Sequence, residues 1–142
     1  MKIAVASDHA GYKLKEFVKA KLLERGHQVE DFGAHDEKST DYPDHGRPAA
    51  EAVARGAVER AVLVCGAGIG MSMVANKVRS VRAALCGNLY SARMARAHND
   101  ANVLVLGARV IGEGLAEEIL DLFLDTSFEG GRHARRVEKI ET

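Results

Sequence analysis

The chain lacks several features that would point to particular protein classes. It contains no tryptophan and only 5% aromatic residues, so stacking platforms for bases or sugar rings are not expected. Its two cysteines, Cys65 and Cys86, form no CxxC pair and show no metal-type spacing, which suggests a reducing cytoplasm rather than a disulfide framework or a zinc site. Twenty basic residues balance twenty acidic ones, so the net charge gives no case for nucleic acid or a membrane surface.

Long apolar runs are also missing. No run approaches the roughly 20 residues that a bilayer-spanning helix needs. The apolar start, MKIAVASDHAG, meets Asp8 too soon for a signal peptide. With 142 residues, 46% hydrophobic and 28% charged, the composition is that of a globular protein with its own core. We therefore expect a single domain over residues 1–142, located in the cytoplasm, with no membrane or nucleic-acid partner.

Short β-branched apolar runs alternate with longer segments of helical periodicity. Strands are predicted at 3–6, 27–32, 61–65, 81–85 and 103–106, helices at 14–26, 49–57, 69–78, 89–97, 115–123 and about 131–141, and a loop over 33–45. The last three strands are apolar throughout rather than alternating, which is typical of a parallel sheet covered by helices on both faces. The pattern predicts a three-layer α/β/α sandwich with a doubly wound, Rossmann-like, five-stranded parallel sheet.

In such folds ligands bind outside the carboxyl ends of the strands. The segments that directly follow predicted strands are Ser7–His9, Cys65–Gly70, Cys86–Asn88 and Gly107–Arg109. The residues with chemical potential are therefore expected where the fold places a site.

The glycine-rich stretch GAGIG at residues 66–70 fits no nucleotide-binding motif. A dinucleotide fingerprint needs GxGxxG with an acidic residue about 20 positions on, and a P-loop needs GxxxxGK[ST]; both are absent. What remains is a turn of free backbone N–H groups at a helix N-terminus, suited to an anion or a developing oxyanion, or a simple tight strand–helix turn.

Several side chains near these turns can carry chemistry. Cys65 lies where the helix dipole and the amides favour a thiolate, so it is a candidate nucleophile or base. The alternative is that Cys65 is a buried cysteine that acts as a small hydrophobic side chain. For Cys86 we adopt this second interpretation. Asp8 and His9 can divide acid–base and anion-binding work, or Asp8 is only an N-cap. His98 closes a helix, where a histidine can also be a simple dipole contact.

Arg132 and Arg136 are four residues apart and so share one helix face. Two guanidinium groups on one face can clamp a phosphate, although a solvated basic end is the common alternative. Together, the candidate groups indicate a site that binds a phosphorylated small molecule beside a thiol base.

The chain resembles the ribose-5-phosphate isomerase B family, which also includes galactose-6-phosphate and allose-6-phosphate isomerases. The similarity runs in order from residue 1 to about 140. The matching stretches are SDHAG at 7–11, DYPD at 41–44, CGAGIGMS at 65–72, ANK at 75–77, RAALC at 82–86, ARAHNDANVLVLGARV at 95–110, and the R-x-x-x-R tail.

This resemblance implies an aldose–ketose isomerase of the pentose phosphate pathway that needs no metal or organic cofactor and works through ring opening and a cis-enediolate. Cys65 would move the proton between C2 and C1. His98 would help to open the furanose ring, and Asp8 would contact the sugar hydroxyls. The backbone amides that would stabilise the enediolate oxygens are those of Gly66, Ala67, Gly68, Ile69 and Gly70.

The resemblance also implies how the substrate is held. His9, Arg132 and Arg136 would bind the phosphate, with Arg109 a further candidate. The residues implied to line the sugar site are Asn99 and Tyr42. In this family the site lies between two subunits, so a homodimer or tetramer with shared active sites is implied, with the helix at about 131–141 at the subunit interface.

Two positions refine the comparison. Met71 stands where one branch of the family carries a glutamate base, so this chain falls in the cysteine branch. Ala67 stands where threonine or serine is usual, which removes a hydroxyl that would contact the substrate. The lead hypothesis is interconversion of ribose 5-phosphate and ribulose 5-phosphate. The alternatives are an isomerase of a six-carbon aldose phosphate, such as allose 6-phosphate, and a non-catalytic sugar-phosphate sensor.

Overall fold

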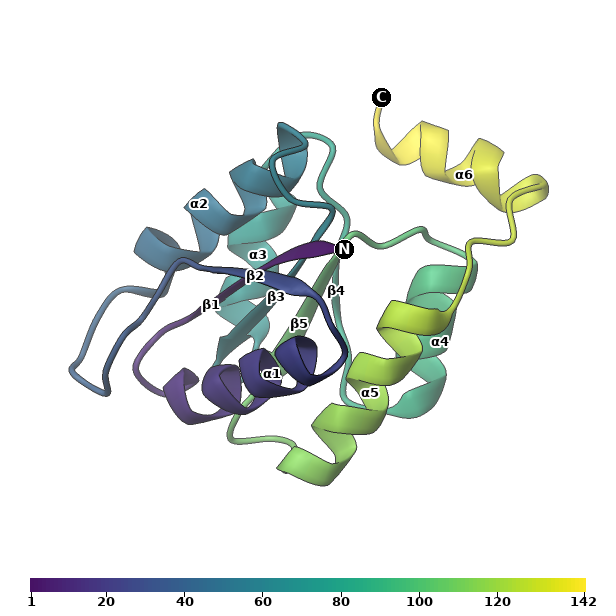
Figure 1. Ribbon diagram of the computed structural model, residues 1–142. Coiled ribbons are helices and arrows are strands. Elements are labelled where there is room, and N and C mark those ends of the chain that lie inside the picture. Colours follow the sequence, from purple (N-terminus) through teal and green to yellow (C-terminus); the bar gives the residue numbers. More distant parts are fainter.

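A five-stranded parallel sheet forms the centre of the computed structural model, which describes residues 1–142 (Figure 1). The strands are β1 (Lys2–Ser7), β2 (Gln28–Asp31), β3 (Arg60–Cys65), β4 (Ala83–Leu85) and β5 (Val103–Gly107). They lie in the order β2-β1-β3-β5-β4, and every neighbouring pair is parallel. The predicted five-stranded parallel sheet is confirmed.

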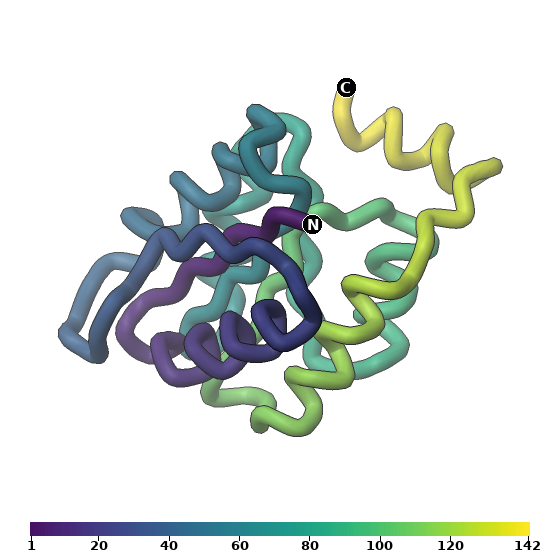
Figure 2. Tube along the Cα trace, viewed as in Figure 1, coloured from purple at the N-terminus to yellow at the C-terminus, as the bar shows by residue number.

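Six helices accompany the sheet: α1 (Tyr12–Glu24), α2 (Tyr42–Ala54), α3 (Ile69–Asn76), α4 (Leu89–Ala97), α5 (Glu113–Asp125) and α6 (Arg132–Ile140). One apolar core lies between the sheet and α1, α4 and α5, and a second lies between the sheet and α2 and α3. This is the predicted α/β/α sandwich. The exception is α6, which has no buried residue and extends away from the sheet (Figures 1 and 2). No helix is long and apolar enough to span a bilayer.

The alternation of side chains along β1 explains the two cores. Ile3 and Val5 point into the first core, and Ala4 and Ala6 point into the second. Both sets are fully buried because helices cover both faces, so the strand is apolar throughout.

The structure corrects two expectations at the ends of elements. The predicted loop over 33–45 is too long, since α2 already begins at Tyr42; Pro43 lies in the first helical turn, where its missing N–H is not needed. The prediction that the strand over 81–85 is covered on both faces is wrong at Leu85, which is 41% exposed. The reason is that β4 is an edge strand.

A buried ion pair holds α1 against the end of β2. The Lys15 ammonium group is fully buried and donates to both carboxylate oxygens of Asp31, at 2.9 and 3.0 Å. Burial by itself raises the pKa of Asp31, but the Gly33 amide and the ammonium groups of Lys15 and Lys19 together lower it below the usual value. A carboxylate is therefore maintained at the point where the chain enters the loop that precedes α2.

Candidate active site

The turns that follow β1, β3 and β5 lie side by side at one edge of the sheet. Ser7 pairs with Val64, and Cys65 pairs with Gly107. The Arg109 amide continues this contact by donating to the Gly66 carbonyl oxygen at 2.9 Å. Because all strands run the same way, this is the carboxyl edge, and β1 and β3 flank the point where the strand order reverses. The candidate residues gathered here, called the carboxyl-edge group, are Asp8, His9, Tyr42, Cys65, Gly66, Ala67, Gly68, Ile69, Gly70 and Arg109.

Asp8 and Cys65 are both enclosed side chains at this edge. Asp8 is 8% exposed and Cys65 is 5% exposed, and Cys65 is a free thiol. The Oδ1 atom of Asp8 accepts the Gly11 amide at 2.9 Å, so Asp8 closes the turn into α1. Its Oδ2 atom has no hydrogen-bond partner in the chain, which leaves it for a ligand.

The loop between β3 and α3 exposes backbone donors. The amides of Gly66, Ala67 and Gly68 donate to no group of the chain. Gly68 has a φ of +81° and directly precedes the first residue of α3, so the helix begins from a left-handed turn. Unpartnered N–H groups at a helix N-terminus favour negative charge. The loop can therefore bind an anion or stabilise a developing oxyanion beside Cys65.

Close packing leaves little room for side chains around this loop. A Cβ atom on Gly107 would lie 2.6 Å from the Ala67 carbonyl oxygen, and one on Gly70 would lie 2.7 Å from the Tyr42 ring. The Tyr42 ring therefore lies directly over the loop, and it does so because α2 begins at this residue. Arg109 reaches the same place: its Nη1 atom would be 3.6 Å from a Cβ atom on Gly66.

His9 is held in a defined state by the loop before α2. Its Nδ1 atom accepts the Thr40 amide at 3.2 Å. Since Nδ1 accepts this hydrogen bond, Nε2 carries the ring proton and is the donor available to a ligand.

The second cysteine behaves as predicted. Cys86 is 2% exposed and belongs to the first apolar core. Burial raises the pKa of its thiol to about 11, so it stays protonated at neutral pH.

The remaining candidates lie at the opposite edge of the sheet. His98 follows α4 and Asn99 precedes β5, so both lie on a loop that leads into a strand. Arg132 and Arg136 lie on α6 and are exposed. These four residues, called the amino-edge group, are not brought together with Cys65 within one chain.

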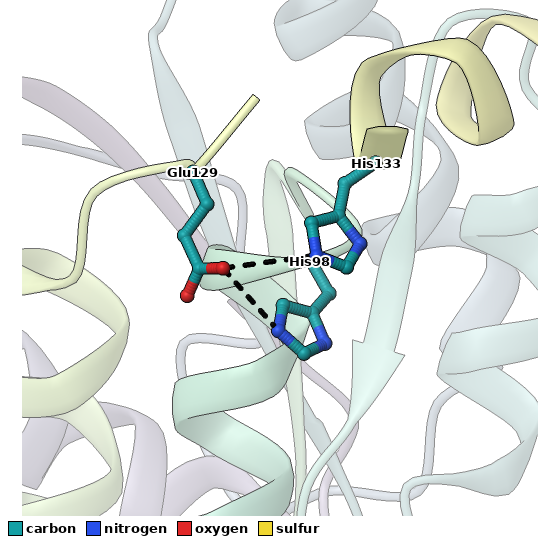
Figure 3. Close-up of side chains that lie close together, drawn as sticks. All are labelled: His98, Glu129 and His133. Carbon is teal, nitrogen blue, oxygen red and sulfur yellow. Dashed lines mark ion pairs between the residues drawn. The ribbon is translucent and has the colours of Figure 1, made fainter. Parts of the chain in front are cut away.

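His98 is part of a compact cluster with two residues that the sequence analysis did not single out (Figure 3). Its ring stacks on His133 with centroids 4.0 Å apart and planes 10° from parallel. The Glu129 Oε1 atom lies 3.6 Å from His98 Nε2 and 3.7 Å from His133 Nε2. Loss of hydration, the neighbouring His98 and the arginines of α6 lower the pKa of His133, although Glu129 opposes them. The i, i+4 spacing of Glu129 and His133 is the only sequence signal for this cluster.

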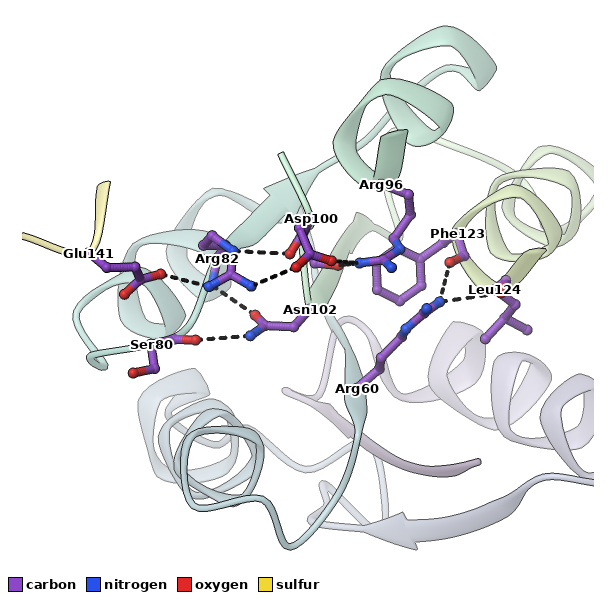
Figure 4. A network of polar contacts seen from close by, with 10 residues as sticks. Arg60, Ser80, Arg82, Arg96, Asp100, Asn102, Phe123, Leu124 and Glu141 are labelled. Carbon is purple, nitrogen blue, oxygen red and sulfur yellow. Dashed lines mark hydrogen bonds and ion pairs between the residues drawn. The ribbon is translucent and has the colours of Figure 1, made fainter. Parts of the chain in front are cut away.

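A polar network fixes the loop that carries His98 and Asn99 (Figure 4). Arg82 donates to the Asp100 carbonyl oxygen at 3.0 Å and to Glu141 Oε1 at 2.6 Å. Arg96 donates to Asp100 Oδ1 at 2.9 Å. Asp100 has a φ of +47°, an uncommon conformation for a non-glycine residue that these contacts hold in place. Through Glu141, the same network ties down the end of α6.

A single chain has no enclosed pocket around Cys65. Of its four cavities, none is lined by a residue of the carboxyl-edge group. The largest, about 530 Å³, lies between the end of α3 and the end of α6. Another, about 250 Å³, is lined by Asn99 of the amino-edge group.

The chain is similar over nearly its whole length to known sugar-phosphate isomerases. The model of the family described as ribose/galactose isomerase matches residues 3–140. Ribose-5-phosphate isomerase B of Escherichia coli is 48% identical over 139 residues, covering 98% of this chain and 93% of that protein. D-erythrulose-4-phosphate isomerase of Pectobacterium atrosepticum is 45% identical over 142 residues, covering 99% and 93%. The solved structure of Clostridium thermocellum ribose-5-phosphate isomerase B is 53% identical with a TM-score of 0.98, covering 99% of this chain and 95% of that one.

The loop geometry predicts different costs for two glycine substitutions. Gly68→Ala would force a left-handed alanine and place its Cβ atom against Leu85 Cδ1, so we expect it to lower the free energy of unfolding by about 2 kcal/mol. Gly66→Ala is the matched control, with ordinary contacts at 3.6–3.7 Å, and should cost less than about 1 kcal/mol. Urea unfolding measures both, and equal costs would contradict the strained turn.

Proposed function

The chain belongs to the ribose/galactose isomerase family, and from this premise we propose that it is an aldose–ketose isomerase that interconverts ribose 5-phosphate and ribulose 5-phosphate. The observation that carries the proposal is the enclosed Cys65 thiol at the end of β3, directly followed by three amides without partners. Two unpaired cysteines favour a reducing compartment, so we place the activity in the cytoplasm.

In the proposed mechanism Cys65 is the base. Its thiolate removes the proton from C2 of the open-chain ribose 5-phosphate, which gives a cis-enediolate, and the resulting thiol returns a proton to C1 while a proton passes from the C2 hydroxyl group to the C1 oxygen, which gives ribulose 5-phosphate. The amides of Gly66, Ala67 and Gly68 donate to the enediolate oxygens, and their fixed orientation stabilises the charge that develops there. The free Oδ2 atom of Asp8 accepts a hydrogen bond from a sugar hydroxyl group. The mechanism needs no metal or organic cofactor, since base and oxyanion donors come from the chain.

We propose that a second copy of the chain completes each site, in a homodimer or tetramer. Two observations support this: the amino-edge group lies across the sheet from Cys65, and Cys65 has no pocket in a single chain. The loop is also bordered by exposed apolar side chains that a partner would cover, with Ile69 52%, Met73 63% and Val110 67% exposed. The unburied helix α6 is well suited to lie at this interface.

The proposed role of each residue follows from the edge of the sheet at which it lies. His98 of the partner subunit opens the furanose ring, and Asn99 of the partner subunit contacts the sugar beside Tyr42. Arg132 of the partner subunit and Arg136 of the partner subunit hold the phosphate, to which His9 donates through Nε2 and Arg109 contributes charge. Phosphate binding far from the reacting carbons orients the substrate.

Because of Ala67, six-carbon aldose phosphates are a second possible class of substrate. Its side chain is exposed on the loop and offers no hydroxyl to a sugar. A six-carbon aldose phosphate such as allose 6-phosphate has more room beside alanine than beside threonine. One relative of the chain is named for a four-carbon sugar phosphate, so the family's substrates differ in length. A non-catalytic sensor is the third possibility, but it would not need the thiol, the amides and His98 together.

Replacing the base provides the main test. We expect Cys65→Ala to lower kcat by about 10³-fold, because no other side chain at this position can take the proton. Substrate binding, measured by calorimetry, should persist, since the phosphate contacts remain. Cys86→Ala is the matched control and should retain activity because its thiol is buried in the core. Substantial turnover by Cys65→Ala would show that the base lies elsewhere, and binding without turnover by the natural sequence would favour the sensor.

Comparing several sugar phosphates tests which of them is the preferred substrate. We expect kcat/KM for ribose 5-phosphate to exceed that for allose 6-phosphate and erythrulose 4-phosphate, measured in one coupled assay. Ala67→Thr should lower activity toward the six-carbon sugar more than toward ribose 5-phosphate, because it fills the space beside the loop. A preference for allose 6-phosphate in the natural sequence would reverse the assignment.

Mixing two inactive variants tests the shared site. Cys65→Ala and His98→Asn remove groups from opposite edges, so a mixed dimer would contain one intact site and one doubly altered site. Refolding the two in equal amounts should restore about one quarter of the natural activity, since half of the dimers are mixed and each has one of two sites. No recovery, with mixed dimers shown to form by native mass spectrometry, would mean that each chain builds its own site.

A further inference from the structure

We propose that His98, Glu129 and His133 form a binding site for a divalent transition-metal ion such as Zn²⁺, and that the bound ion inhibits the isomerase. The metal site stands on geometry alone. The inhibition rests on the proposed function, in which His98 opens the sugar ring. These three residues are the only group of three histidine, cysteine or acidic side chains in the chain with donor atoms close enough to share an ion.

The donor atoms are spaced almost as a zinc ion requires. His98 Nε2 and His133 Nε2 lie 3.6 and 3.7 Å from the same Glu129 oxygen, and all three donors lie within 4.8 Å of one another. In a tetrahedral site with metal–ligand distances of about 2.0–2.2 Å, two ligand atoms lie about 3.3–3.6 Å apart. A tilt of the two rings and a small contraction around an ion would bring these donors to coordination distance. Two imidazoles and a carboxylate are a known zinc ligand set that leaves the fourth position open.

The backbone places the three side chains together before any ion binds. The Glu129 amide donates to the Ala97 carbonyl oxygen at 3.0 Å, which joins the segment before α6 to the end of α4, next to His98. His133 follows Glu129 by four residues, and its amide donates to the Gly130 carbonyl oxygen at 3.0 Å. The stacked rings direct both Nε2 atoms toward Glu129 (Figure 3). The backbone therefore holds the three residues together, and an ion would have to tilt the stacked rings so that their lone pairs converge on it.

The cluster is also accessible, unlike the chain's thiols. The side chains of His98 and Glu129 are 38% and 55% exposed, so an ion can enter from solvent. Cys65 and Cys86 are both buried. The exposed Arg132 and Arg136 on the same helix carry positive charge and oppose a cation, so we expect moderate affinity and reversible binding.

Occupancy has a direct chemical consequence. An ion on His98 Nε2 uses the lone pair with which the imidazole would accept or pass on a proton during ring opening. It would also hold His98 and His133 together at the start of α6, beside the arginines that are proposed to bind phosphate. The ion is therefore an inhibitor of this site and takes no part in the reaction.

Calorimetric titration of the metal-free protein with Zn²⁺ at pH 7.5 tests the site without reference to activity. We expect one ion per chain. Glu129→Gln and His133→Asn should each weaken binding by about tenfold or more, because each removes a ligand. Glu138→Gln, an exposed carboxylate on the same helix, is the matched control and should bind as the natural sequence does. Cys65→Ala should also keep the ion, which would exclude a thiol ligand. Circular dichroism checks that each variant is folded.

The inhibition is measured separately, as the Zn²⁺ concentration that halves turnover in the presence and absence of EDTA. We expect EDTA to restore activity, and Glu129→Gln to need about tenfold more Zn²⁺ than the natural sequence for the same inhibition. Unchanged Zn²⁺ affinity in both Glu129→Gln and His133→Asn would overturn the metal site. Stoichiometric binding with no loss of turnover would overturn the inhibition. A protein that binds Zn²⁺ as expected but isomerises no sugar phosphate would overturn the proposed function and leave the metal site supported.

Discussion

All five strands of the sheet run in the same direction, and the placement of every candidate residue depends on this constraint. Loops that leave strands gather at one edge, and loops that enter strands gather at the other. Cys65 and Asp8 therefore lie at the carboxyl edge, whereas His98 and Asn99 lie at the amino edge of the same sheet. Within one chain the two groups therefore lie at opposite ends of the strands. The proposed shared site is the consequence, because a second copy can present its amino edge to the first copy's carboxyl edge.

At the carboxyl edge, backbone rather than side chains provides the chemistry of the loop. Gly68 takes a left-handed conformation, and Gly107 and Gly70 leave space for the Ala67 carbonyl oxygen and the Tyr42 ring. Because these glycines have no side chains, the loop packs closely against β5, and its amides remain without hydrogen-bond partners beside Cys65. The same compact turn that connects a strand to a helix thus provides donors for negative charge.

The helix α6 shows how an element without a buried face can be positioned by polar contacts at its two ends. Near its start, His133 stacks on His98, and Glu129 Oε1 lies 3.6 and 3.7 Å from their Nε2 atoms. At its end, Glu141 accepts from Arg82, which also holds Asp100 on the loop after α4. The arginines of α6 and the His98 loop are consequently fixed relative to each other. That arrangement suits the proposed binding of the substrate phosphate on a neighbouring copy, and it also creates the proposed metal site.

The sequence alone determined the strands, the glycine loop beside Cys65, the three-layer fold and, by resemblance, the family, because these features depend on local periodicity, on turn residues and on short motifs. The start of α2 at Tyr42 was not predicted, since proline and glycine patterns indicate that a boundary exists without giving its position. The exposure of Leu85 was not predicted either, because the apolar content of a strand does not reveal whether that strand lies at an edge of the sheet. The pairing of His98 with His133, and of Arg82 with Glu141, was decided only by the tertiary structure. These partners are separated by tens of residues, and their contact depends on how α4, β4 and α6 meet in space, which no local pattern records.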